Sequence, residues 1–123
     1  MASPRDDCLF CSIVRDGAYV HQAKGFVAIN DLNPRAPVHV LVLPERHVGT
    51  FRDVSEFDAK ESKRMLEFVA ETAEKVGLRE YRVLVNVGAG GGQTIFHLHW
   101  HILGGGESRD HVPTAAATAE AEA

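Results

Sequence analysis

The apolar residues of this chain gather in short runs before its middle. GFVAIND (25–31) and VHVLVLP (38–44) are rich in β-branched residues and are bounded by Gly, Asn and Pro. Both runs therefore predict strands, joined by the loop LNPRAP.

The period of the apolar positions changes at Ser55. From there to Gly77 the sequence predicts one long helix, with Ser55 as its N-cap and Gly77 as its C-cap. The apolar stripe of that helix would be Met65, Leu66, Val69, Ala73 and Val76.

Strand character returns after the helix. YRVLVNV (81–87) predicts one strand, and a second is expected from Thr94 to Leu103, beyond the glycine-rich stretch GAGGG. Two strands on a tight glycine loop predict an antiparallel hairpin, and the order of elements predicts an α+β fold. In the second strand, alternate side chains would share one face, so we expect this of His97, His99 and His101.

Composition limits the classes of protein to consider. With 123 residues, 45% of them hydrophobic, the chain predicts one domain over 8–106, between a disordered N-terminus (1–7) and a flexible tail (107–123). A net charge of −4 without a Lys/Arg cluster argues against nucleic acid or an anionic membrane as partner. No apolar run reaches membrane-span length and no secretion signal is evident, so we expect a cytoplasmic protein.

The two cysteines form a Cys-x-x-Cys pair, Cys8 and Cys11. Such a pair supplies two thiolates from one turn, and tetrahedral zinc needs two further ligands, for which His39, His47 and His97 are candidates. Two small buried cysteines remain the plain alternative. A thioredoxin-like redox role is disfavoured because the order of elements lacks the βαβ context of that motif.

The histidine triplet has two serious interpretations, metal ligation and nucleophilic or acid–base chemistry. A neutral imidazole can attack phosphorus directly, without a metal. The glycine loop before the triplet is either a flexible turn or a phosphate-binding loop. Gln93 and Thr94 favour the second, because an amide and a hydroxyl there could bond a phosphate oxygen or a leaving group.

At these residues the chain resembles a known family. HLHWHIL (97–103) resembles the histidine-triad signature, and residues 30–47 and 85–105 are similar to the Hint branch of that family. The resemblance implies an antiparallel sheet of about five strands, one long helix and a short N-terminal helix. It further implies a homodimeric purine nucleoside phosphoramidase or nucleotidyl hydrolase, with a covalent nucleotidyl-histidine intermediate and no organic cofactor.

The resemblance also implies roles for individual residues. His99 would be the nucleophile, His101 would hold phosphate or assist the departing amine, and His39 would help to orient the triad. Asp31 would bind the ribose hydroxyls. The apolar walls of the base pocket would be formed by Phe10, Ile13, Ile29 and Leu32. The phosphate or the leaving group would be contacted by Asn86, Gly92, Gln93 and Thr94.

In two places the chain departs from animal Hint proteins. The cysteine pair resembles zinc-bearing prokaryotic-type members, which implies a structural zinc held by Cys8, Cys11, His47 and His97. The segment after Gly106 lacks the tryptophan-bearing end through which Hint dimers shape the leaving-group site. The leaving group is therefore left open.

Two hypotheses compete with the covalent mechanism. In the first, His97 and His99 bind a catalytic zinc with His39 as third ligand, and water is the nucleophile. In the second, the protein is a non-enzymatic nucleotide sensor with little turnover. The intact triplet argues against the sensor, since binding alone does not require its central histidine.

Overall fold

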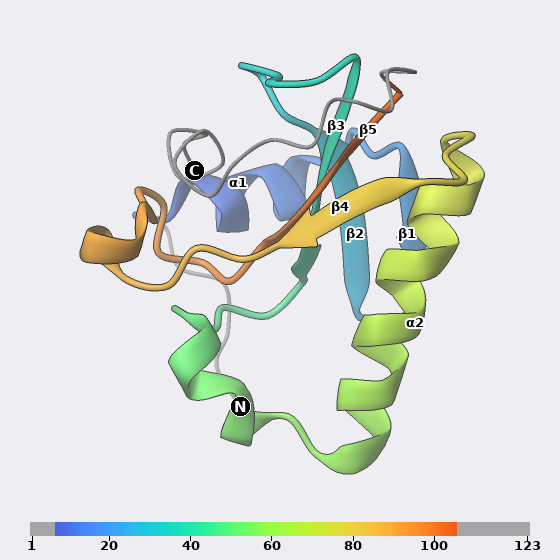
Figure 1. Ribbon diagram of the computed structural model, residues 1–123. Coiled ribbons are helices and arrows are strands. Elements are labelled where there is room, and N and C mark those ends of the chain that lie inside the picture. Colours follow the sequence, from blue (N-terminus) through green and yellow to red (C-terminus); the bar gives the residue numbers. More distant parts are fainter. Residues whose placement is uncertain (1–6, 106–123) are drawn as a thin grey trace.

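The computed structural model describes residues 7–105 of the chain. They form a five-stranded antiparallel sheet in the order β1-β2-β3-β5-β4, with a helix on each face (Figure 1). The predicted α+β fold is therefore confirmed. The elements are α1 (Leu9–Asp16), β1 (His21–Ala23), β2 (Phe26–Asn30), β3 (Val38–Pro44), η1 (Phe51–Glu56), α2 (Ala59–Lys75), β4 (Tyr81–Leu84), η2 (Ala89–Gly91) and β5 (Trp100–Gly104).

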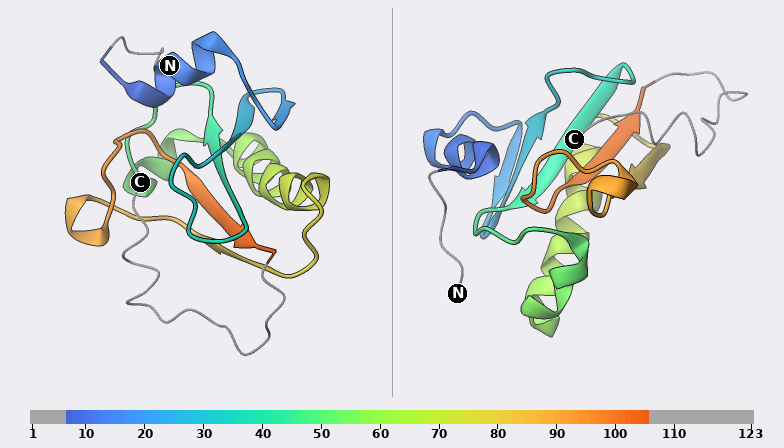
Figure 2. Two further views of the ribbon diagram at one scale, coloured as in Figure 1. Left: turned by 90° about the horizontal axis from the view of Figure 1, so that it is seen from above. Right: turned by 90° about the vertical axis from the view of Figure 1, so that its left-hand side faces the viewer.

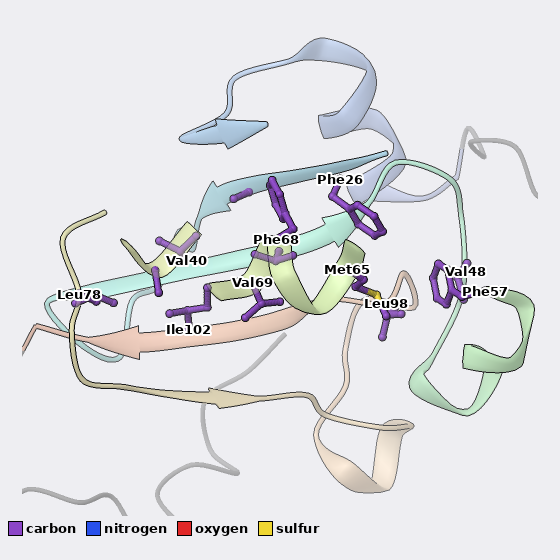
Figure 3. Packing of buried hydrophobic residues seen from close by; sticks show 13 residues of the cluster. Phe26, Val40, Val48, Phe57, Met65, Phe68, Val69, Leu78, Leu98 and Ile102 are labelled. Atoms are coloured by element: carbon purple, nitrogen blue, oxygen red, sulfur yellow. The ribbon is translucent and has the colours of Figure 1, made fainter. Parts of the chain in front are cut away.

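The two faces of the sheet bury two separate apolar clusters. Along β3, Val40 and Val42 belong to the cluster under α2, whereas Leu41 and Leu43 belong to the cluster under α1. This alternation follows from the period of two in a strand. Figure 2 shows α1 and α2 on opposite sides of the sheet, and Figure 3 shows the larger cluster, which packs beneath α2.

The long helix is shorter than the sequence predicted. Ser55 is not its N-cap but lies inside the 3₁₀ helix η1, and the N-cap is Asp58, whose carboxylate accepts the Glu61 N–H at 2.8 Å. At the other end the C-cap is Val76 rather than Gly77. Gly77 follows it with a left-handed φ of 86°, where a residue without Cβ is favoured.

One residue of the predicted apolar stripe lies on the exposed side of α2. Leu66 is 56% exposed, because it lies one position, about 100°, around the helix from Met65. The buried face instead consists of Met65, Phe68, Val69, Thr72 and Ala73.

The predicted histidine strand is also shorter than expected. Strand β5 begins only at Trp100, so His97 and His99 precede it and only His101 lies within it. Pairing of β5 with β3 ends at the Val42–Trp100 pair. Before that point the chain follows other partners, since the Leu98 N–H donates to the Val48 carbonyl at 2.6 Å.

The predicted antiparallel pairing of the last two strands is confirmed, but the tight glycine loop between them is wrong. β4 and β5 do pair antiparallel, but residues 85–99 join them through the short 3₁₀ helix η2. The buried side chain of Gln93 stabilises this loop by hydrogen bonds to backbone groups. Its side-chain oxygen accepts the Gly88 N–H at 2.9 Å, and its amide donates to the carbonyls of Gly49 and Ile95 at 2.9 and 3.0 Å.

Two further predictions concern the ends of the chain and membrane-spanning segments. The predicted unstructured ends, 1–7 and 107–123, lie outside the described residues apart from Asp7. Within residues 7–105, no helix is both long enough and apolar enough to span a bilayer.

Candidate functional site

A largely apolar cavity of about 670 Å³ lies between α1 and the strands β2 and β3. Of the residues predicted to form a base pocket, all four line it, and Asp31 and Thr94 line it as well. Phe10 and Ile29 are buried walls, while Leu32 is 88% exposed. The size and the largely apolar lining suit a small-molecule ligand with an apolar portion.

Several lining residues were not predicted from the sequence. Leu9 stands four positions before Ile13 on α1, so helical spacing would have indicated it. Leu41 shares a face of β3 with His39, which the strand period would have indicated. Tyr19 and Ile95 come from irregular segments, and no sequence signal points to them.

Three histidine rings lie together beside this cavity. The ring centroids of His99 and His101 are 5.2 Å apart, and those of His39 and His101 are also 5.2 Å apart. Phe10 links them to the cavity, because its ring meets His99 edge-on at 4.9 Å. All three histidines are buried, and His99 is only 2% exposed.

The hydrogen bonds of His99 identify the nitrogen that carries its lone pair. Its Nδ1 lies 2.7 Å from the carbonyl oxygen of His97. Because a carbonyl oxygen only accepts, Nδ1 carries the hydrogen in the neutral ring and Nε2 carries the lone pair. A backbone carbonyl therefore holds His99 in the tautomer that a nucleophile acting through Nε2 requires.

Four potential metal ligands form a second group. The ligand atoms of Cys8, Cys11, His47 and His97 all lie within 4.8 Å of one another. Cys8 is the N-cap of α1, and its sulfur accepts the Cys11 N–H at 3.4 Å, so one helical turn presents both sulfurs. His47 lies just beyond β3 and His97 just before β5.

The spacing of these donors fits zinc. A tetrahedral ion with Zn–S bonds of about 2.3 Å and Zn–N bonds of about 2.0 Å holds sulfur and nitrogen about 3.5 Å apart. His97 Nδ1 lies 3.5 Å from both sulfurs, and His47 Nδ1 lies 3.3 Å from Cys11 Sγ. Four protein ligands fill a tetrahedral shell, so such an ion would have no open position for a substrate.

His97 is also in the correct tautomer for a metal ligand. Its Nε2–H donates to the Pro44 carbonyl at 2.8 Å, which leaves the lone pair on Nδ1, facing the two sulfurs. Burial lowers the pKa of His97 to about 4, although the bond to Pro44 acts in the opposite direction. The ring is therefore neutral near pH 7, as ligation demands.

The remaining predicted residues lie in the loops around this site. The Gln93 amide bonds loop backbone groups, Gly92 ends η2 with a φ of 97°, and Thr94 is exposed on the cavity wall. Asn86 is half-buried just after β4.

The catalytic-zinc hypothesis receives no support from this arrangement. Within residues 7–105, His97, His99 and His39 do not form a group of ligand atoms close enough to share an ion. The Nδ1 atom of His97 faces the cysteines, whereas His99 Nδ1 donates to a backbone carbonyl.

Comparisons with known proteins agree with the fold and the triplet. The HIT domain model matches residues 14–108. A HIT-like protein of Chlamydia pneumoniae is 40% identical over 87 residues, which cover 70% of this chain and 79% of that protein. The purine nucleoside phosphoramidase of Escherichia coli (strain K12) is 34% identical over 105 residues, covering 81% of this chain and 88% of the relative.

A solved structure gives the same result. The HIT family hydrolase of Legionella pneumophila superimposes with a TM-score of 0.74 at 36% identity, over 82% of this chain and 95% of that one. The triplet, the antiparallel sheet and these matches lead to one conclusion: the chain belongs to the HIT domain family and is a HIT family hydrolase.

Proposed function

We propose that the protein hydrolyses purine nucleoside 5′-phosphoramidates, or related nucleotidyl conjugates, through a covalent nucleotidyl-histidine intermediate. One observation carries the proposal. The His97 carbonyl fixes the Nδ1–H of His99, so the lone pair is on Nε2 of a ring that contacts Phe10 in the cavity wall.

The reaction would proceed in two displacements. Nε2 of His99 attacks the α-phosphorus and forms a P–N bond while the bond to the leaving group breaks. The leaving amine takes up a proton as it departs, and His101 holds a phosphate oxygen or assists this departure. Water then attacks phosphorus, the P–N bond to His99 breaks, and the nucleoside monophosphate is released with His99 in its neutral form. The proton that water loses in this step balances the proton that the leaving amine took up. Because His99 is 2% exposed, substrate entry must first open this part of the site.

Substrate recognition would come from the cavity. Phe10, Ile13, Ile29 and Leu32 supply apolar surface for a purine, and Asp31 supplies a carboxylate for the ribose hydroxyls. Asn86, Gly92, Gln93 and Thr94 belong to the loop expected to face the phosphate or the leaving group. The name of the E. coli relative, purine nucleoside phosphoramidase, supports the same substrate class.

A structural zinc ion belongs to the same proposal. Cys8, Cys11, His47 and His97 would hold it, and its role would be to fix α1 against the segment that carries the histidines. The donor spacing and the tautomer of His97 support zinc. Reduced thiolate ligands also suit a cytoplasmic protein, because the cytosol keeps thiols reduced.

The decisive experiment compares the wild type with His99→Ala on adenosine 5′-phosphoramidate. The wild type should release AMP, and His99→Ala should lose turnover by a factor on the order of 10³ or more while still binding AMP. A rapid denaturing quench at alkaline pH, followed by mass spectrometry, should detect a nucleotidyl adduct on His99 in the wild type alone.

His21→Ala is the matched control, since His21 stacks on Phe68 under α2, on the other face of the sheet. It should retain turnover. Unchanged turnover in His99→Ala would remove His99 as nucleophile, and AMP binding without turnover in the wild type would favour the nucleotide sensor.

A further inference from the structure

Asp31 belongs both to the cavity wall and to the histidine group. It lines the cavity, and its Oδ2 lies 3.4 Å from Nε2 of His39. The same His39 nitrogen lies 2.9 Å from Nδ1 of His101. The Asp31 carboxylate at the cavity wall is thus connected to His101 through the His39 ring.

The backbone around Asp31 holds the carboxylate firmly. Asp31 follows β2 directly, and its backbone N–H donates to the His39 carbonyl at 2.9 Å. Its Oδ1 accepts the Asn33 N–H at 2.9 Å, which leaves Oδ2 facing His39. Both side chains are largely shielded from water, with exposed fractions of 10% for Asp31 and 1% for His39.

Three contacts determine where the hydrogens of the paired rings lie. The Arg35 N–H donates to Nδ1 of His39 at 3.1 Å, so this nitrogen carries the lone pair. Nε2 of His39 then carries the hydrogen and donates it to His101 Nδ1, beside the Asp31 carboxylate. Nδ1 of His101 is therefore an acceptor, and His101 presents Nε2–H as a donor.

A metal ion is the alternative occupant, since ligand atoms of Asp31, His39 and His101 also lie within 4.8 Å of one another. Ligation through His39 Nε2 would require its hydrogen to move to Nδ1. That hydrogen would then oppose the Arg35 N–H, a donor facing a donor. The hydrogen-bonded arrangement gives both nitrogens of His39 and Nδ1 of His101 a partner of the correct type, so it is the better account.

We infer that Asp31 is a positioning residue, which holds His39 in the Nε2–H tautomer and thereby keeps His101 as an Nε2–H donor towards the substrate. This inference rests on the proposed function, in which Asp31 also binds the ribose. A carboxylate that only accepts is suited to this role, as it is for the orienting aspartate of a serine protease triad. Asparagine has the same shape, but its amide would direct a donor at His39 or at the Asn33 N–H.

Kinetics can separate the two roles of Asp31. The wild type, Asp31→Asn and Asp31→Ala would each be assayed with adenosine 5′-phosphoramidate and with its 2′,3′-dideoxy analogue, which has no ribose hydroxyl to bind. On the dideoxy analogue, Asp31→Asn should have a kcat lower than the wild type by about tenfold or more. Asp31→Ala should fall between them, because the Arg35 N–H still favours the correct tautomer. Equal kcat values for the three proteins on the analogue would overturn the inference.

A second measurement does not depend on turnover. Nitrogen NMR of protein labelled at histidine reports the tautomer of each ring. In the wild type, His39 and His101 should both carry hydrogen on Nε2, and Asp31→Asn should shift both towards the other tautomer. Unchanged tautomers in a folded Asp31→Asn protein would also overturn the inference. Absent turnover in the wild type with these tautomers present would instead contradict the proposed function alone.

Discussion

At the scale of single residues, the three neighbouring histidines differ in which nitrogen carries a hydrogen. His97 and His101 hold it on Nε2, whereas His99 holds it on Nδ1. The Pro44 carbonyl decides the tautomer of His97, the His97 carbonyl decides that of His99, and the His39 ring decides that of His101. Residue type suggested the chemistry of the triplet, but the tautomers depend on these contacts.

The buried His97 gives the metal-free protein an acid-sensitive stability. Burial lowers its pKa from 6.5 in the unfolded chain to about 4 in the folded one. Below pH 6.5 the unfolded chain therefore binds a proton that the folded protein does not, so the free energy of unfolding falls with pH until about 4. The loss approaches 1.4 kcal/mol per pH unit, about 3 kcal/mol in all.

Urea unfolding in the presence of a chelator measures this effect. Between neutral pH and the pKa of about 4, the wild type should lose more unfolding free energy than His97→Gln, which has no imidazole to titrate. Identical losses in both proteins would assign the acid sensitivity to other groups.

At the scale of elements, the two edges of the sheet differ in character. β4 is an edge strand with two exposed apolar side chains, Tyr81 at 37% and Val83 at 43%. β1 at the other edge has only three residues, with Gln22 and Ala23 exposed. An exposed apolar edge favours pairing with another strand, so β4 is the expected interface of the predicted homodimer.

Substitution of Val83 tests that interface. Val83→Lys places a charge on the β4 edge and should convert a dimer to a monomer, halving the mass found by light scattering. Gln22→Lys introduces the same charge on β1 and should leave the dimer intact. A monomeric wild type, or a dimer that tolerates Val83→Lys, would contradict pairing through β4.

At the scale of the whole molecule, the four candidate metal ligands come from segments far apart in the chain. Cys8 and Cys11 belong to the start of α1, His47 follows β3 and His97 precedes β5. Because α1 also carries Phe10 and forms a wall of the cavity, we expect a zinc ion held by these residues to fix the position of that wall.

Removal of zinc should therefore weaken both stability and nucleotide binding. Cys8→Ser, or chelation of the wild type, should lower the free energy of unfolding by several kcal/mol. The KM for adenosine 5′-phosphoramidate should rise more than kcat falls, because the ion has no open position for the substrate. Zinc content, calorimetry and steady-state kinetics measure these changes.

Ser12→Ala is the control on the same helix and should keep its zinc, and added zinc should reverse the effects of chelation. Metal content unchanged in Cys8→Ser would disprove the zinc site. Loss of zinc with KM unaltered would show that the cavity wall does not depend on it.

The sequence by itself determined the fold class and supplied the candidate residues for the chemistry. The periods of apolar positions identified β2, β3, β4 and α2, because local burial patterns repeat at two or 3.6 residues. The Cys-x-x-Cys pair indicated metal ligands for a similar reason, since one helical turn brings residues three apart together.

Only the tertiary structure decided how the site is assembled. Where the histidine strand begins depends on Val48, because its carbonyl accepts the Leu98 N–H and so takes residue 98 out of the ladder with β3. The tautomer of His39 depends on the Arg35 N–H, and the position of Asp31 beside it depends on the pairing of neighbouring strands. Backbone N–H and carbonyl groups make these contacts. Every residue type carries them alike, apart from the missing N–H of proline, so their effect on the site cannot be read from side-chain identity.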